Sequence, residues 1–307
     1  MALFIFLALF LVACHSASDN QGIETYIAPR GRNPAAQNIR WSPIDEDIIL
    51  VFGVELPSTP AEIYTYNIQT RDKNALVKER PGFLFDAMWT PDGEHILIMS
   101  QPDMPGYQPH GWWVMNIKNG TKNYYLASGD IAYSPDGKTI AILREIRAGN
   151  RILGIELSLV NVATREESLV YSNLEVDQSR GISWSSDGQL IAFSLCSESD
   201  CDLYIWLVEK NVLERITQDG RNQEPVWSPS GQVLAYLMRD KSNIAWHYLM
   251  LTTPQKNCEL KIPTKQPVLS VSWSPDGKHL AYLDADGVYS VDVEKIFGRD
   301  IYQNFCD

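Results

Sequence analysis

The amino-acid sequence predicts an all-β protein, a six-bladed β-propeller made of four-stranded antiparallel blades. Three observations predict it. One short phrase recurs six times at a nearly constant interval, each copy joins a turn to an apolar run of strand length, and no stretch has the pattern of a long amphipathic helix. Repeat periods between about 20 and 50 residues are typical of solenoids, propellers and arrays, and the missing helical pattern removes the α-solenoids.

The repeated phrase begins with an aromatic residue, and its last copy reads WSPDGKHLAYLD. The six aromatic anchors are Trp41, Trp89, Tyr133, Trp184, Trp227 and Trp273. Successive anchors are 48, 44, 51, 43 and 46 residues apart. The residue two positions before each anchor is apolar and shares its side of the strand, because side chains alternate with a period of two. We therefore predict that the anchors pack between neighbouring blades.

Each repeat has room for four strands. In the last copy residues 274–277, SPDG, have the composition of a tight turn, with Gly at the position that favours a positive φ. Residues 278–283 and 288–293 then read as two strands joined by a second turn. A polar outer segment, such as residues 213–217, and the segment before the anchor complete the four. Four-stranded meanders at this period are propeller blades.

The N-terminal part of the repeat region is predicted to close the ring. Residues 24–28, ETYIA, resemble the outer-strand segment 123–127, NYYLA, and only 34 residues follow Trp273. An outer strand supplied from residues 24–28 would complete the last blade and cover an exposed strand edge. The competing candidate for this strand is the segment 301–305.

The first residues predict export. Residues 1–13, MALFIFLALFLVA, are too short to span a bilayer and have the length of a signal-peptide core. The sequence Leu11-Val12-Ala13-Cys14 resembles the lipobox of bacterial lipoproteins, although no Lys or Arg precedes the apolar run. The resemblance implies cleavage before Cys14 and lipid attachment there; the alternative is an ordinary signal peptide. The predicted domains are a signal peptide at 1–13, a lipidated tether at 14–23 and a propeller at 24–307.

Four cysteines remain once Cys14 is lipidated. Cys196 and Cys201 flank a short turn where two strands of the fourth blade meet, which brings them within disulfide range. Cys258 and Cys306 are then left to pair by elimination. No CxxC or nearby His provides metal-ligand spacing, so we predict no metal site and no cofactor.

Composition and motifs limit the function classes. The formal net charge is −12, and no basic run exists to neutralise phosphates, which argues against nucleic acid. The sequence has no GxSxG, HExxH, P-loop or GxGxxG motif. We expect a monomeric propeller that is not an enzyme and has no catalytic residue.

The residue three positions before each anchor varies from blade to blade and begins the innermost strand. These residues are Asn38, Asp86, Asp130, Gly181 (with Arg180 beside it), Glu224 and Ser270. Because the inner strands surround the channel, we predict that these side chains converge on one mouth of it. They would form a polar site for a basic peptide, a cation or a sugar. The alternative is a solvated funnel whose polar groups face water.

The phrase at residues 225–236, PVWSPSGQVLAY, preceded by TQDG at 217–220, resembles the repeat of TolB-type propellers. It is similar to the WD-like repeats of bacterial surface proteins, and the resemblance covers residues 24–307. It implies six blades outside the cytoplasm. Together with the lipobox-like sequence, this leads us to expect a membrane-anchored lipoprotein of the cell envelope or periplasmic face. The expected function is that of a scaffold that binds an envelope protein or peptide. The alternative is a carbohydrate-binding or lyase-like propeller that uses the carboxylates and Arg180.

Overall fold

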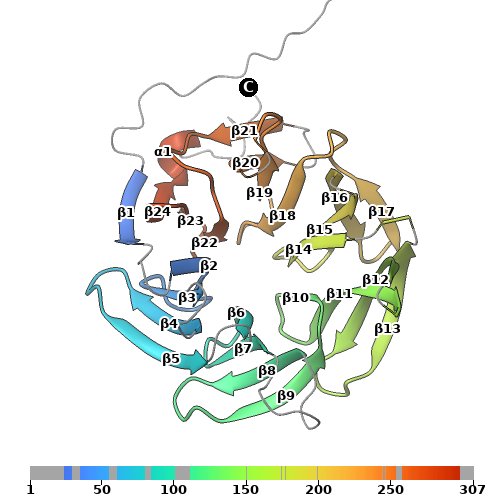
Figure 1. Ribbon diagram of the computed structural model, residues 1–307, viewed down its shortest axis with the longest axis horizontal. Helices are drawn as coiled ribbons and strands as arrows, with labels where there is room; N and C mark the ends of the chain where they lie inside the picture. The colour runs from blue at the N-terminus through green and yellow to red at the C-terminus, as the bar shows by residue number, and fades with distance from the viewer. Residues whose placement is uncertain are drawn as a thin grey trace, which may run out of the picture.

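The computed structural model describes residues 24–29, 35–54, 61–79, 84–100, 111–149, 151–173, 175–176, 178–198, 200–243, 245, 247–253 and 258–297. The strands of this part form six four-stranded antiparallel sheets, arranged as a ring (Figure 1). The predicted six-bladed β-propeller is confirmed.

The blades follow one another along the chain, and each begins with its innermost strand. Blade 1 contains β2 (Ala35–Trp41), β3 (Ile48–Val54), β4 (Ala61–Asn67) and β5 (Lys73–Glu79). Blade 2 contains β6 (Leu84–Trp89), β7 (His95–Ser100), β8 (Gly111–Asn116) and β9 (Lys122–Ala127). Blade 3 contains β10 (Asp130–Tyr133), β11 (Thr139–Ala148), β12 (Arg151–Asn161) and β13 (Glu167–Asn173).

The second half of the ring repeats this plan. Blade 4 contains β14 (Gln178–Trp184), β15 (Leu190–Ser197), β16 (Asp200–Leu207) and β17 (Val212–Arg215). Blade 5 contains β18 (Asn222–Trp227), β19 (Leu234–Arg239), β20 (His247–Thr253) and β21 (Cys258–Ile262). Blade 6 contains β22 (Ser270–Trp273), β23 (His279–Leu283) and β24 (Gly287–Asp292), with β1 (Glu24–Pro29) as its outer strand and the short helix α1 (Val293–Phe297) after it.

The N-terminal strand closes the ring. β1 pairs with β24 in an antiparallel register that runs from Glu24 opposite Val291 to Pro29 opposite Gly287. Ile27 is buried in the cluster that also contains Trp41, so the first strand joins the core between the last and first blades. The prediction for residues 24–28 is confirmed, while the competing segment 301–305 lies outside the described residues.

The aromatic anchors pack between blades, as predicted. The indole Nε1 of Trp89 donates to the backbone carbonyl of Arg40 at 3.2 Å, in the preceding blade. Trp184 and Trp273 make the same bond at 3.1 and 3.2 Å to the carbonyl one position before the preceding anchor. All of these anchors also lie in apolar contact with inner strands, so each repeat joins its own blade to its neighbour.

The turn after each anchor is held by its own side chains. In blade 4 the Ser185 hydroxyl donates to Asp187 at 2.6 Å, and the N–H of Gln189 donates to the same carboxylate at 2.9 Å. These hydrogen bonds lower the pKa of Asp187. Gly188 follows with φ of 71°, a left-handed conformation that glycine adopts without a steric penalty. The repeated phrase is therefore explained by folding.

One of the predicted disulfides is present. Cys196 and Cys201 lie directly opposite each other on β15 and β16, with Cα atoms 4.0 Å apart and their sulfur atoms bonded. The prediction for this pair is confirmed. The side chains of Cys258 and Cys306 lie outside the described residues, as does Cys14, so their pairing and lipidation stay predictions. No helix of the described part is long and apolar enough to cross a membrane.

Candidate binding site at the channel mouth

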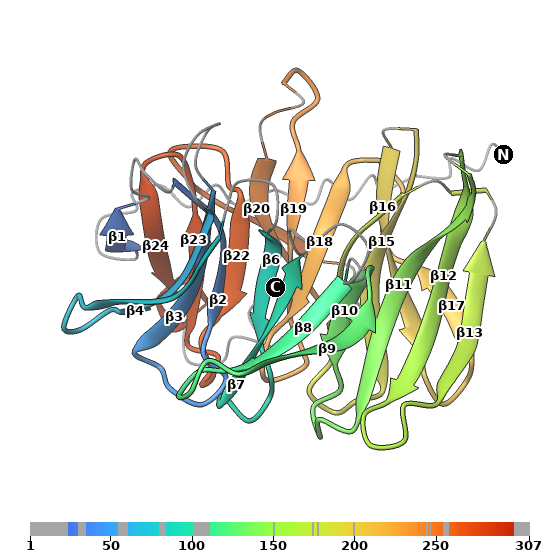
Figure 2. The same ribbon diagram turned by 60° about the horizontal axis from the view of Figure 1, so that its bottom comes forward.

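All six inner strands begin at the same end of the ring, which we call the mouth. In an antiparallel meander the start of the first strand lies at the same end as the loop between the second and third strands. The turns after the anchors therefore lie at the opposite end, which we call the turn face. Figure 2 shows the strands running between these two ends.

Irregular pairing shapes the strands at the mouth. The register between the first and second strands shifts at Gln37 in blade 1 and at Phe85 in blade 2. Shifts also occur between Ser179 and Ile182 in blade 4 and between Gln223 and Val226 in blade 5. Bulges of this kind bend a strand and re-aim its side chains. In blades 3 and 6 the inner strand simply begins at the predicted position.

Hydrogen bonds connect the predicted residues of blades 6, 1 and 2. The Ser270 hydroxyl donates to Oδ1 of Asn38 at 2.6 Å, and Nδ2 of Asn38 donates to Oδ1 of Asp86 at 2.7 Å. The N–H of Ile39 donates to the Ser270 hydroxyl at 3.2 Å. The structure therefore brings these three residues together, and their polar atoms are largely used by one another.

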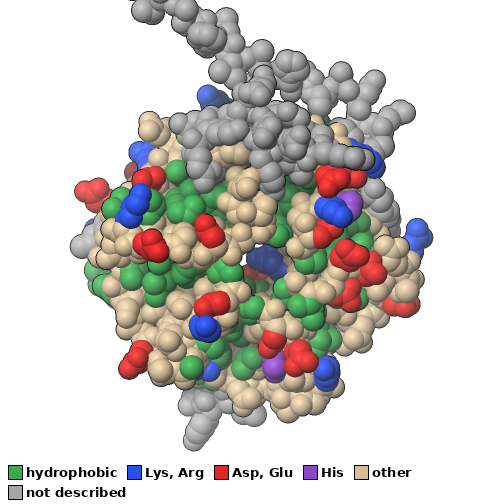
Figure 3. Space-filling model, turned by 180° about the vertical axis from the view of Figure 1, so that it is seen from behind, with side chains coloured by type: hydrophobic (Ala, Val, Ile, Leu, Met, Phe, Trp, Pro, Cys, Tyr) green, Lys and Arg blue, Asp and Glu red, His purple; other side chains and the backbone are tan. Residues whose placement is uncertain are grey.

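Arg40 is a member of this cluster that the sequence analysis missed. Its Nη1 donates to Oδ1 of Asn38 and, at 3.0 Å, to the carbonyl of Ile39. Its Nη2 lies 3.6 Å from Oδ2 of Asp86. Figure 3 shows Lys or Arg atoms inside the central opening, beside Asp or Glu atoms. A signal existed, because Arg40 is the only charged residue among the six that directly precede an anchor.

Asp130 and Gly181 meet on the other side of the mouth. Oδ2 of Asp130 accepts from the N–H of Gly181 at 3.2 Å and from the Ser179 hydroxyl at 3.4 Å. Burial and, after it, the nearby charge of Asp86 raise the pKa of Asp130 to about 6. Two like charges thus face each other where blades 2 and 3 adjoin.

Glu224 of blade 5 sits against Gly181 of blade 4. A Cβ on Gly181 would lie 2.7 Å from the Cα of Glu224, so only glycine fits there, and its φ is 75°. Glu224 itself has φ of 55°, which is rare for a residue with a side chain. Enclosure by protein raises the pKa of Glu224 to about 7; Arg40 and Arg180 oppose this shift, while Asp130 and Asp86 add to it.

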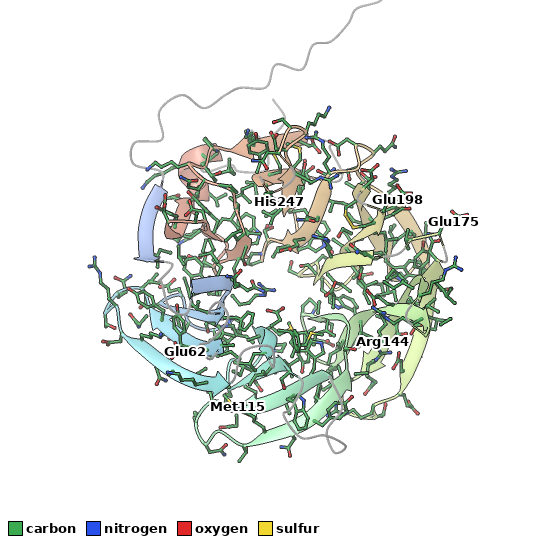
Figure 4. The ribbon with its side chains drawn as sticks, in the orientation of Figure 1. Glu62, Met115, Arg144, Glu175, Glu198 and His247 are labelled. Carbon is green, nitrogen blue, oxygen red and sulfur yellow. A yellow bond between two sulfur atoms is a disulfide. The ribbon has the colours of Figure 1, made fainter. Side chains whose placement is uncertain are left out.

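Arg180 lies exposed beside these carboxylates. Its guanidinium donates to the amide oxygen of Gln223 at 3.3 Å and to that of Gln178 at 3.4 Å. Within the described residues it forms no ion pair. Burial lowers the pKa of His247, and the positive charge of Arg180 lowers it further. His247 begins β20 in blade 5, whereas Glu175 and Glu198 lie toward the outside of the ring (Figure 4).

The mouth is therefore a mixed cluster of charges rather than a purely acidic rim. Every predicted residue lies at this end of the channel, and Asp130 and Glu224 are close enough to Arg40 to interact with its charge. Among the residues that the structure describes, no group of three or more His, Cys, Asp or Glu side chains is placed to hold a metal ion. The site can bind a ligand through hydrogen bonds and charge pairing, made by side chains that are fixed on strands.

Comparisons with known proteins identify the class of fold. No protein-family model and no curated protein matches the chain. The structure is similar to TolB from Acinetobacter baumannii, with a TM-score of 0.61 and 15% identity over 83% of this chain and 63% of that chain. It is also similar to a TolB from Agrobacterium tumefaciens described as putative, with a TM-score of 0.60 and 20% identity over 75% of this chain and 79% of that chain.

A third similar structure is an oligogalacturonate lyase from Vibrio parahaemolyticus, with a TM-score of 0.56 and 11% identity over 87% of this chain and 91% of that chain. At sequence identities this low, the structural similarity shows only that the fold is shared. The protein is thus a six-bladed β-propeller with the fold of the TolB propellers. It spans less than two thirds of the Acinetobacter TolB chain, at 63%.

Proposed function

We propose that this protein is a non-enzymatic, lipid-anchored propeller of the cell envelope that binds a protein or peptide at the mouth. The observation that carries the proposal is the cluster of polar and charged side chains from all six blades at one end of the channel. These side chains are held on paired strands, so little conformational entropy is lost when they contact a ligand. The TolB-like fold supports an extracytoplasmic scaffold.

The position of the first strand supports a mouth that stays accessible on an anchored protein. Glu24 pairs with Val291 near the end of β24, which lies on the turn face, and Pro29 pairs with Gly287 at the mouth end. The chain from Cys14 therefore joins the propeller on the face opposite the mouth. Residues 14–23 reach at most about 35 Å when extended. A lipid on Cys14 would hold the turn face toward the membrane and the mouth away from it.

The anchor is tested by metabolic labelling with radioactive palmitate. The wild-type chain should be labelled and should sediment with membranes, and Cys14→Ser should abolish both. Two acyl groups hold a protein stably on a membrane while one binds marginally, so the membrane fraction should resist a salt wash. Unchanged labelling of Cys14→Ser contradicts the lipoprotein proposal and leaves an ordinary signal peptide as the account of residues 1–13.

The binding role is tested by crosslinking in intact cells, followed by purification and mass spectrometry. A partner captured by the wild-type chain should be lost when Glu224→Gln and Asp130→Asn are combined. The matched control is Glu209→Gln with Asp136→Asn, which removes the same two charges from the turn face. If the mouth variant and the control capture the same proteins in the same amounts, the mouth is not the binding site.

A second candidate function is recognition or lyase cleavage of an acidic carbohydrate. The observation that favours it is the similarity to oligogalacturonate lyases, which have the same propeller fold. Asp86, Asp130 and Arg180 would then contact the sugar. Glycan-array binding that Asp86→Ala and Asp130→Ala abolish supports this alternative, as does release of unsaturated products from oligogalacturonate. Absence of both leaves the scaffold proposal as the better account.

A further inference from the structure

We infer that the mouth takes one cationic side chain of its partner, a lysine or arginine, between the carboxylates of Glu224 and Asp130. This inference rests on the proposed peptide-binding function and specifies the chemistry of the bound segment. It follows from the arrangement of the fixed charges, from one carboxylate that has no partner in the described residues, and from an exposed aromatic ring at the same end of the channel.

Glu224 is the carboxylate without a partner. Its side chain is half-buried and lies close enough to Arg40, Asp130, Asp86 and Arg180 to interact with their charges. It accepts no hydrogen bond and forms no ion pair with any residue in the described ranges. A half-buried carboxylate has lost part of its hydration, which a hydrogen-bond donor or a cation can replace. A group that supplies donors and positive charge is therefore what this position lacks.

The resident cations do not fill this role. Arg40 is committed to Asn38, to the carbonyl of Ile39 and to Asp86. Arg180 is exposed and donates to two neutral amide oxygens. Asp130 and Glu224 thus share a side of the channel, and neither forms an ion pair with a cation in the described residues. An additional ammonium or guanidinium group would gain attraction from both, since close charge pairs in an enclosed site interact strongly.

The backbone holds the two carboxylates in place before any ligand arrives. Gly181 donates its N–H to Asp130 at 3.2 Å, and its Cα side faces the backbone of Glu224. Glu224 is kept in the left-handed region by this contact and by the irregular pairing of β18. Rare backbone conformations that the surrounding structure enforces are concentrated at functional sites. A fixed pair of acceptors loses little entropy when a cation binds.

Phe85 favours a peptide over a free inorganic ion. It occupies the bulge next to Asp86 at the mouth, and 44% of its surface is exposed. An apolar neighbour of the cationic residue in the peptide can cover such a ring. Burial of apolar surface adds about 25 cal/mol per Å² to the binding free energy. A lone metal ion would gain nothing from this contact.

Binding of a cation at this position is linked to protons. The pKa of Glu224 is about 7 and that of Asp130 about 6, so both carboxyl groups are partly protonated near neutral pH. A cation between them lowers both pKa values, and protons are released on binding. Affinity therefore rises as the pH increases from about 5.5 to 7.5, because the carboxylates no longer need to lose a proton first. His247 and Arg180 also face this region. Arg180 keeps its positive charge throughout, whereas the lowered pKa of His247 leaves that side chain neutral at neutral pH and above.

The experiment uses the purified chain and a positional-scanning array of heptapeptides, in the presence of a chelator. We expect selection for Lys or Arg at one position with an apolar residue adjacent. A selected peptide is then measured by isothermal titration calorimetry in two buffers of different ionisation enthalpy. Glu224→Gln and Asp130→Asn should each weaken binding about tenfold or more, while Arg180→Gln should tighten it several-fold by removing a like charge. Glu209→Gln on the turn face should change nothing.

The outcomes separate this inference from the proposed function. If the array selects acidic or purely apolar peptides whose binding is lost in Glu224→Gln, the mouth binds peptides and the cationic inference is overturned. If the array shows no selection, or no substitution at the mouth alters it, both fail. Weaker binding by Glu224→Gln together with tighter binding by Arg180→Gln supports the inference. A variant that merely fails to fold would only lose binding. Binding without proton release at pH 6.5 contradicts it.

Discussion

Replacing Gly181 with alanine gives the sharpest test of how the mouth is built. The new Cβ would lie 2.7 Å from the Cα of Glu224, and the nearest contact is backbone that has no free torsion with which to move away. Two penalties add. A non-glycine residue at φ of 75° costs about 1 kcal/mol, and overpacking against fixed atoms adds about 1–3 kcal/mol. The free energy of unfolding should fall by about 2–4 kcal/mol.

Gly120→Ala is the matched control. Gly120 has φ of 70°, but no atom lies within 4 Å of its would-be Cβ, so only the backbone penalty of about 1 kcal/mol applies. Both variants are unfolded in urea and compared at a common m-value. The difference between their losses in free energy of unfolding measures the steric contact between the backbone of Glu224 and a side chain at position 181. If the two variants lose the same free energy within about 0.5 kcal/mol, the proposed packing of blade 4 against blade 5 is wrong.

Three further predictions concern stability. Because the folded-state pKa of Glu224 is raised from 4.5 to about 7, the protonated form favours folding. Its contribution of up to about 3 kcal/mol is fully present below pH 4.5 and is lost as the pH rises through 7; urea unfolding across this range should show a smaller decline for Glu224→Gln. Replacing Cys196 and Cys201 with serine should cost about 2 kcal/mol for so short a loop, and a reductant should then have no further effect on the urea midpoint; an equal reductant effect in the variant would argue against this bond. Ile27→Ala should cost about 2–4 kcal/mol in calorimetry or urea because it loosens the strand that closes the ring, whereas Ile44→Ala, at a side chain that is 64% exposed, should cost less than about 0.5 kcal/mol; equal losses would show that closure by the first strand contributes little.

The fold could be predicted because its information is local and repeated. A period of 43–51 residues, a turn in each repeat and alternation in each strand specify the blade without any distant contact. Closure by residues 24–28 could also be predicted, because the outer strands of different blades are similar in sequence. The pairing of Cys196 with Cys201 followed from hairpin register in the same way.

The position of the mouth could be predicted from the sequence, but the contacts between its side chains could not. Aligning the anchors placed six residues at one end of the channel, since every repeat has the same geometry. The spacing of the repeats did not indicate Arg40, because a residue next to an anchor is normally part of the strand surface. Only the bulged pairing of the inner strands shows that this guanidinium reaches Asn38 and Asp86.

By itself, the sequence determined the number of blades, their strands, the packing role of the aromatic residues and the end of the channel where the repeats diverge. These properties depend on patterns within one repeat. The tertiary structure alone decided which charges are satisfied: Asp86 has Arg40, while Glu224 is pressed against Gly181 of another blade and has no partner in the described residues. That outcome depends on distances between residues more than 40 positions apart in the chain, which the ring sets and which local patterns do not encode.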